Sequence, residues 1–272
     1  MAADLHIHTT ISDGTDTPEQ IVKQALALGL DAIAITDHDI MDGAIIASRV
    51  ATGKNITVLS GVEISCYYNT DEVHILGYFD QVVSSELTKT LAEMRNFRWQ
   101  RAKLIVEKLK HVGINIKWQR IREIAGDGSV GRPHIADALV EKKIVPNRET
   151  AFKKYIGTGC PAYVPRKKIS PIEAIDLITQ SKGVAVLAHP GTINSQFFSQ
   201  IGQWIKHGLH GIEVWHPHHS VMQSQYFLNQ AKALDLIPTG GSDYHGLKHA
   251  SCNSLGAVTA PMESVERIIE LL

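Results

Sequence analysis

Short apolar segments alternate with helical segments over most of this sequence, and this alternation limits the possible folds more than any other feature. Residues 32–36 are a nearly continuous apolar run, typical of a parallel strand buried on both faces. Thr17 and Pro18 predict the start of a helix, because threonine caps helix ends and proline suits the first turn. Further strands are predicted at residues 5–8, 56–59, 73–78, 184–188, 211–214 and 237–239. These repeated units predict an α/β fold, either a parallel barrel or an open sheet.

The pattern changes near residue 84, and helical segments then dominate to about residue 160. Residues 85–112 are predicted to form one long helix with Leu87, Leu91 and Leu109 turned inward. We therefore expect a barrel made of residues 1–84 and 161–272, and a helical insertion of residues 85–160 that contributes to substrate binding. Basic residues on the long helix form either a solvated face or a face that binds a polyanion. They are Arg95, Arg98, Arg101, Lys103, Lys108 and Lys110.

The composition argues against several classes of protein. With 27 Lys and Arg against 28 Asp and Glu, the formal net charge is −1, so a basic surface for duplex DNA is not expected. Cys66, Cys160 and Cys252 form no CxxC pair, which argues against a thiolate zinc site and a disulfide framework. The N-terminus lacks a signal-peptide pattern, and no apolar stretch approaches the roughly 20 residues that span a bilayer. We expect a cytoplasmic monomer without membrane contact.

Histidine is abundant, with 14 residues, and it gathers with carboxylates around the predicted strands. In α/β folds, ligands bind at the carboxyl ends of parallel strands. His6 and His8 lie two residues apart on one strand, so both imidazoles point to the same face. One such histidine is most simply a packed side chain. Seven strands with His, Asp or Glu are not explained by packing, because a buried carboxylate is costly unless paired or metal-bound. The segments are His6–His8, Asp37–Asp39, Gly61–Glu63, His74, Ala188–Pro190, Glu213–His216 and Gly241–His245.

These ligand types limit the metal and the chemistry. Imidazole and carboxylate without thiolate suit Zn, Mn or Fe(II), and a carboxylate such as Glu63 can bridge two ions. Ions about 3.5–4 Å apart are the usual apparatus for displacement at phosphorus, where they activate water and neutralise charge. The sequence thus predicts a phosphoesterase with two or three divalent metal ions.

The motifs, in this order, resemble the PHP (polymerase and histidinol phosphatase) superfamily over nearly the whole chain. The matching segments are His6-Ile7-His8 with Asp13-Gly14, Thr36-Asp37-His38, Gly61-Val62-Glu63, His74, Ala188-His189-Pro190 and Ser242-Asp243-Tyr244-His245. The resemblance implies a distorted seven-stranded β/α barrel with an inserted helical subdomain. It also implies a metal-dependent phosphoesterase that uses a metal-activated hydroxide.

The resemblance further implies a role for each ligand. The first ion would be held by His6, His8, Glu63 and Asp243. The second would be held by Glu63, His74 and His189, with Glu63 bridging. The third would be held by Asp13, His38 and His245. Some relatives have His at the position of Asp13, so this harder carboxylate is expected to favour Mn or Fe. Asp37 would either orient an imidazole or act as a turn residue.

A narrower resemblance lies inside the predicted insertion, at Gly131-Arg132-Pro133-His134. It is similar to the branch that contains 3′,5′-nucleotide bisphosphate phosphatases and 5′→3′ oligoribonucleases. Arg132 and His134 would contact the substrate phosphate, for which the planar guanidinium group is suited. Arg132-Pro133 equally predicts a helix start. His216 is a further candidate phosphate contact, and Lys167 and Lys168 either add positive potential or lie in solvent. Catalytic roles would fall to Glu63, Asp243, Arg132 and His134.

The implied substrates are nucleoside 3′,5′-bisphosphates, such as adenosine 3′,5′-bisphosphate losing its 3′-phosphate, or short 5′-phosphorylated RNA. Tyr163, Trp215 and Tyr244 are candidates for stacking on a base. One alternative is a histidinol-phosphate phosphatase, against which the Arg132 to His134 motif argues. Another is a non-catalytic metal-binding or regulatory module, which would be expected to have lost ligands. None of the nine predicted metal ligands is missing from this sequence.

Overall fold

The computed structural model describes residues 2–69, 71–80, 84–126, 128–165, 169–193, 197–246 and 254–272. Cys252, Lys167 and Lys168 lie outside this range. Among the described residues, no helix is both long and apolar enough to cross a membrane.

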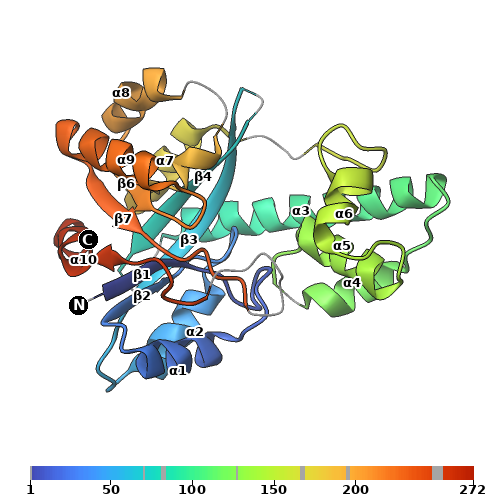
Figure 1. The fold of residues 1–272 in the computed structure, drawn as a ribbon, viewed down its shortest axis with the longest axis horizontal. Coiled ribbons are helices and arrows are strands. Elements are labelled where there is room, and N and C mark those ends of the chain that lie inside the picture. Colours follow the sequence, from blue (N-terminus) through green and yellow to red (C-terminus); the bar gives the residue numbers. More distant parts are fainter. Residues whose placement is uncertain are drawn as a thin grey trace.

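Within the described residues, the sheet has eight strands and curls into a nearly closed barrel (Figure 1). Its order is β7-β6-β5-β4-β3-β2-β1-β8. β7 and the chain after it return to β1, because the Ile7 backbone pairs with Tyr244 and the Ser242 amide donates to Asp4 Oδ1 at 2.9 Å. The strands are β1 (Ala2–Ile7), β2 (Ala32–Ile35), β3 (Thr57–Tyr68), β4 (Asp71–Phe79), β5 (Val184–Leu187), β6 (Leu209–Trp215), β7 (Ile237–Gly240) and β8 (Ala260–Pro261).

The predicted α/β barrel is confirmed, with two differences in its strands. All seven predicted strands are present, and the eighth is the two-residue β8, antiparallel to β1. A purely parallel barrel is wrong, because β4 runs antiparallel to both β3 and β5. Only residues 69 and 70 separate β3 from β4, whereas a parallel crossover needs about a dozen residues. The amino end of β4 therefore lies beside the carboxyl ends of its neighbours.

Helices cover the outside of the barrel, and several begin as their sequences predict. Thr17 caps α1 in a capping box with Gln20, and Ser170 caps α7 in a capping box with Glu173. Gly29 ends α1 in the left-handed conformation, at φ 70°. The helices flanking the sheet are α1 (Pro18–Leu28), α2 (Asp42–Ala51), α7 (Pro171–Gln180), α8 (Phe198–Lys206), α9 (Val221–Ala233) and α10 (Met262–Leu271).

Apart from a 3-10 turn at Pro190–Thr192 after β5, the remaining described helices lie to one side of the barrel (Figure 1). They are α3 (Ser85–His111), α4 (Trp118–Ala125), α5 (Arg132–Glu141) and α6 (Arg148–Ala151), followed by a π-helical turn at Phe152–Ile156. α3 starts against the barrel core through Leu87 and Leu91, and its second half joins a separate apolar core with Ile121 and Leu139. These helices occupy the range predicted for the insertion. That they form a subdomain which contributes to substrate binding stays a prediction.

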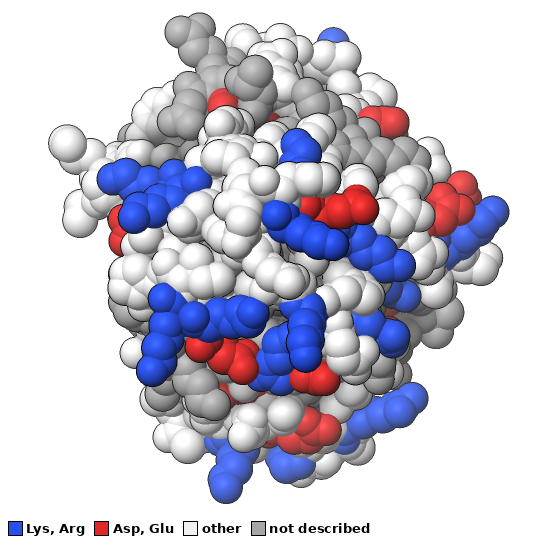
Figure 2. All heavy atoms as spheres, turned by 90° about the vertical axis from the view of Figure 1, so that its right-hand side faces the viewer, with Lys and Arg blue, Asp and Glu red and all other residues white. Residues whose placement is uncertain are grey.

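The basic residues of α3 do not all share one environment. Arg98 and Arg101 are buried, so neither a solvated face nor a polyanion-binding face describes them. Arg98 pairs with Asp39, and Arg101 donates to the Val164 carbonyl at 2.8 Å. On the exposed side of this helical group, Lys and Arg are interspersed with Asp and Glu (Figure 2). The visible face is therefore mixed in charge rather than uniformly basic.

Candidate metal centre

His6, on β1, and His8, directly after it, project into the barrel mouth, and Ile7 packs on the opposite side. Both imidazoles are fully buried. The Nε2 atoms of His6 and His8 lie 3.5 and 3.1 Å from Glu63 Oε2, and 3.4 and 3.3 Å from Asp243 Oδ1. The structure thus brings together the four residues predicted to hold the first ion.

Glu63 lies at the centre of the cluster, and its two carboxylate oxygens face different groups. Oε1 is 2.6 Å from His74 Nδ1 and 3.1 Å from His189 Nε2. Oε2 faces His8 and lies 3.0 Å from His38 Nδ1. Burial opposes the charge of Glu63, but the surrounding imidazoles hold the pKa of this carboxyl well below its usual range. A carboxylate that faces two sets of imidazoles in this way has the arrangement of a bridging ligand.

His74 reaches the site because β4 is antiparallel to its neighbours. It is near the start of β4 and pairs in register with Ser65 on β3. On a parallel strand, a residue this close to the amino end would lie at the opposite end of the barrel. The prediction placed His74 in the ligand set by resemblance, and the strand direction gives the physical reason for its position.

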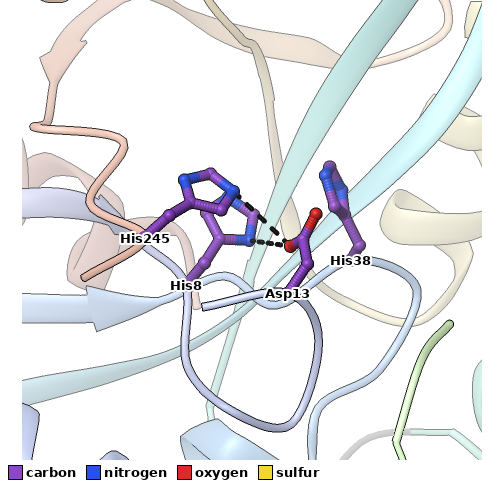
Figure 3. A group of neighbouring side chains, drawn as sticks. All are labelled: His8, Asp13, His38 and His245. Atoms are coloured by element: carbon purple, nitrogen blue, oxygen red, sulfur yellow. Dashed lines mark ion pairs between the residues drawn. The ribbon is translucent and has the colours of Figure 1, made fainter. Parts of the chain in front are cut away.

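A third group consists of His8, Asp13, His38 and His245, whose candidate ligand atoms lie within 4.8 Å of one another (Figure 3). Asp13 comes from the loop after β1, His38 from the segment after β2 and His245 from the segment after β7. Asp13 Oδ1 is 3.4 Å from His245 Nε2 and 3.9 Å from His8 Nδ1. The three residues predicted for a third ion therefore lie together, with His8 shared between this group and the first.

The buried ligand atoms are arranged for metal coordination and not for hydrogen bonding with one another. Among the described residues, His6 Nε2, His8 Nε2, His38 Nδ1 and Asp13 Oδ1 are buried without a hydrogen bond of good geometry. Each nonetheless lies within 4 Å of another candidate ligand atom, a carboxylate oxygen for the imidazoles and an imidazole nitrogen for Asp13. Buried polar atoms are normally satisfied, and a set that converges without hydrogen bonding is what metal coordination requires. We therefore conclude that the residues present fit divalent ions.

Neighbouring acids raise the pKa of four of the predicted histidine ligands, which are His6, His8, His74 and His245. Burial by itself lowers the pKa of His8, but contacts with Asp243 and Glu63 outweigh it and raise the pKa to about 10. For His74, Glu63 and Glu72 outweigh burial and raise the pKa to about 9. A metal must displace these protons, because only a neutral imidazole can coordinate it.

Glu213 is a buried residue of the site that received no role in the sequence analysis. One oxygen lies 3.1 Å from His6 Nδ1, and the other accepts the His189 amide at 2.6 Å. A proton held on His6 Nδ1 leaves Nε2 free to face the metal cluster. The available signal was its place on β6, two residues before Trp215 and inside one of the segments with acidic and histidine residues.

Two residues of the cluster have unusual backbone conformations. His189 has φ 26° and Asp243 has φ 48°, a region that non-glycine residues seldom adopt. The hydrogen bond from the His189 amide to Glu213 helps to hold the first, and a bond between His245 Nδ1 and the Asp243 carbonyl, at 2.9 Å, helps to hold the second. Such strain, about 1–3 kcal/mol per residue, persists where surrounding contacts fix the backbone, typically at functional sites.

Asp37 shapes the loop after β1. It accepts the Thr9 amide at 2.8 Å, the Thr9 hydroxyl at 2.7 Å and the Ser12 hydroxyl at 2.6 Å. Burial nevertheless raises the pKa of Asp37, because these hydrogen bonds do not fully offset desolvation. Ser12 Oγ in turn lies 3.4 Å from His8 Nδ1. Of the two alternatives for Asp37, the turn role describes its direct contacts, and it reaches an imidazole only through Ser12.

Arg132 and His134 begin helix α5 beside the metal cluster rather than within it. The nitrogen Nδ1 of His134 accepts the Gly131 amide at 2.9 Å and caps the helix. Arg132 Nη2 is 3.1 Å from Glu72 Oε2, and its guanidinium lies over Phe152 at 5.2 Å. The predicted helix start is confirmed. Contact of these two side chains with phosphate stays a prediction.

His216 lies directly beside a predicted metal ligand, not at the edge of the site. It is buried, with Nε2 at 3.5 Å from Asp243 Oδ2, and it forms a candidate metal group with His6 and Asp243. Its Nδ1 accepts the His218 amide at 3.1 Å, which leaves the proton of a neutral ring on Nε2. His216 is therefore placed to donate from Nε2 into the site.

Of the three aromatic residues considered for base stacking, Tyr244 is wrongly placed. Its ring is fully buried, and its hydroxyl donates to Asp16 Oδ2 at 2.6 Å. Trp215 and Tyr163 are partly exposed. Tyr163 also lies against Arg101, 5.9 Å from the guanidinium carbon to the ring centre.

The barrel and the ligands in its mouth together define an enzyme of the metal-dependent phosphoesterase class. Comparison with known proteins makes the assignment specific: the chain belongs to the PHP domain family, whose profile matches residues 4–125. The 5′-3′ exoribonuclease Rnm of Salmonella typhimurium is 34% identical over 248 residues, which cover 89% of this chain and 84% of that protein.

Two further relatives support the same class. A 3′,5′-nucleoside bisphosphate phosphatase from Chromobacterium violaceum is 32% identical over 251 residues, which cover 89% of this chain and 86% of that protein. The crystal structure of a protein assigned as a metal-dependent phosphoesterase from Bifidobacterium adolescentis superposes with a TM-score of 0.91. It is 33% identical, and the match covers 99% of this chain and 96% of that one. The predicted family and the predicted class of enzyme are confirmed.

Proposed function

We propose that this enzyme hydrolyses phosphate esters of nucleotides. The substrates would be nucleoside 3′,5′-bisphosphates, losing the 3′-phosphate, and short 5′-phosphorylated oligoribonucleotides. The observation that carries the proposal is the position of Arg132, at the start of α5 and one ion pair away from the His74 and Glu63 side of the cluster. A guanidinium beside a multinuclear site supports recognition of a phosphoryl group. Two relatives are an exoribonuclease and a nucleoside bisphosphate phosphatase, which supports RNA and nucleotides as the substrates.

Nine residues would hold two or three divalent ions of Mn, Fe or Zn. They are His6, His8, Asp13, His38, Glu63, His74, His189, Asp243 and His245. When bound, the ions would activate water and neutralise charge on the phosphoryl oxygens. Glu63 and Asp243 would offset the charge of the ions, as their contacts with His6 and His8 support.

The other side chains would bind and orient the substrate. Arg132 would bind the phosphate with the donors that Glu72 does not use. His216 would donate a hydrogen bond from Nε2 to a phosphoryl oxygen, in keeping with the hydrogen bond that its Nδ1 accepts from the His218 amide. His134 would act from the start of α5, where burial lowers its pKa and Nδ1 accepts the Gly131 amide.

A substrate panel tests the proposal. It contains adenosine 3′,5′-bisphosphate, short 5′-phosphorylated RNA, 5′-AMP and histidinol phosphate. We expect turnover of the first two, loss of turnover after chelation, and recovery with Mn²⁺. Glu63→Gln should remove activity, whereas Glu123→Gln, the same change at an exposed position on α4, should leave it intact. Preferred turnover of histidinol phosphate, or full activity after exhaustive removal of metal, would contradict the proposal.

A further inference from the structure

Glu72 touches both the metal side and the phosphate side of the proposed site. It lies on β4 two residues before His74, so the two side chains project from the same face of the strand. One carboxylate oxygen, Oε2, is 3.1 Å from Arg132 Nη2. The other, Oε1, is 3.6 Å from His74 Nε2, an electrostatic contact rather than a hydrogen bond. Its side chain is 28% exposed, so solvent screens these contacts only in part.

The contact with His74 determines which ring nitrogen can serve as a ligand. His74 Nδ1 faces Glu63 and His189, at 2.6 Å from Glu63 Oε1 and 3.2 Å from His189 Nε2. Nε2 is then the outer nitrogen, and the Glu72 carboxylate favours the proton there. A carboxylate behind an imidazole commonly fixes both the tautomer and the ring orientation of a metal-ligating histidine.

The contact with Arg132 fixes the guanidinium at the start of α5. Phe152 lies beneath the group, 5.2 Å from the ring centre to the guanidinium carbon, and Glu72 holds Nη2. A guanidinium carries five N–H donors in a rigid plane. One ion pair with Glu72 therefore leaves donors for an oxyanion while preventing the side chain from rotating away.

We infer that Glu72 is a positioning residue that couples the phosphate-binding arginine to the metal ligand His74. This inference rests on the proposed function, because it assigns Arg132 to the substrate phosphate. One carboxylate would orient the His74 ring toward the metal cluster and the Arg132 fork toward the substrate. The same contact would hold α5, which carries Arg132, in a fixed position relative to β4, which carries His74.

A double-mutant cycle tests the coupling, with Glu72→Gln, Arg132→Gln and both changes together. The assay measures kcat and KM for adenosine 3′,5′-bisphosphate with saturating Mn²⁺. We expect Glu72→Gln to raise KM about tenfold, as for loss of one charge-assisted hydrogen bond, with a smaller change in kcat. The double variant should be within about threefold of Arg132→Gln alone, because the arginine no longer needs positioning. Additive losses in kcat/KM would overturn the coupling.

Titration with Mn²⁺ alone gives a readout that does not depend on activity. Glu72→Gln should weaken Mn²⁺ binding about 10–100-fold, as expected for loss of a partner behind a ligand, while Arg132→Gln should leave it within about threefold. Unchanged Mn²⁺ affinity in Glu72→Gln would overturn the part of the inference that concerns His74.

Controls separate this inference from protein folding and from the proposed function. Glu123→Gln carries the same chemical change on the exposed face of α4 and should leave both Mn²⁺ affinity and KM unaltered. If Glu72→Gln does not fold, Glu72→Asp keeps the charge but withdraws it by one methylene, and it should show the same pattern more weakly. If the wild-type enzyme does not hydrolyse nucleotides, the proposed function fails, whereas the Mn²⁺ titration still decides the contact with His74.

Discussion

The pair between Arg98 and Asp39 should be a main source of stability where α3 meets the barrel. Arg98 is 5% exposed and Asp39 is 1% exposed, and the Nε atom of Arg98 donates to Asp39 Oδ2. Arg98 Nη2 also donates to Ser65 Oγ at 3.1 Å. Asp39 follows the predicted ligand His38, and its amide bonds to the Glu63 carbonyl at 3.1 Å. The pair therefore lies directly behind two residues of the metal cluster.

Arg98→Met should destabilise the protein strongly. It removes the guanidinium but leaves a buried carboxylate, and breaking a buried pair from one side costs about 3–5 kcal/mol. At about 2–4 °C per kcal/mol for a chain of this size, the melting temperature should fall by roughly 6–20 °C. Thermal unfolding measures the melting temperature, and urea unfolding measures the free energy of unfolding. Both are carried out with Mn²⁺ and after chelation.

A second variant isolates the cause of the loss. Adding Asp39→Asn to Arg98→Met removes the stranded charge, and asparagine tolerates the positive φ of 55° at this position. The double variant should therefore be more stable than Arg98→Met alone. Arg120→Met provides the matched control, since Arg120 makes only exposed ion pairs with Glu123 and Glu141. If Arg98→Met shifts the melting temperature no more than Arg120→Met does, our reasoning about the buried pair is refuted.

Four further predictions concern the site. Glu213→Gln should weaken Mn²⁺ binding about 10–100-fold, because His6 loses the charge that orients it; unchanged affinity in a metal titration would contradict this role. Mn²⁺ affinity of chelator-treated protein should rise with pH by about tenfold per unit for each proton displaced, because the pKa values of His8 and His74 are raised to about 10 and about 9. The same raised pKa values should stabilise the metal-free fold below pH 6.5, and this contribution should vanish as the pH rises through 9 to 10; a melting temperature that increases over that interval would refute it. Asp37→Asn should cost about 1–3 kcal/mol in urea unfolding, because asparagine keeps only one of the two oxygens that accept hydrogen bonds from Thr9 and Ser12; no loss would show that the second acceptor oxygen is dispensable.

Local sequence by itself determined where most strands and helices lie. The helix beginning at Pro18 depends on Thr17 and Gln20, which are its neighbours in the chain. The buried run at residues 32–35 needed no partner to be recognised as a strand. His6 and His8 share a face because side chains alternate along any strand. Caps, periodicity and alternation are local effects, and they can be inferred without knowing the fold.

Tertiary structure decided what long-range contacts control. The sequence did not predict that β4 reverses direction, and this reversal brings His74 to the mouth of the barrel. Nor did it predict that Arg98 is buried, since a charge on a helix is usually solvated unless a distant partner such as Asp39 meets it. Glu213 gained its place from His6, more than 200 residues away in the chain. The free energy of a buried charge depends on the groups around it, and the folded chain alone brings those groups together.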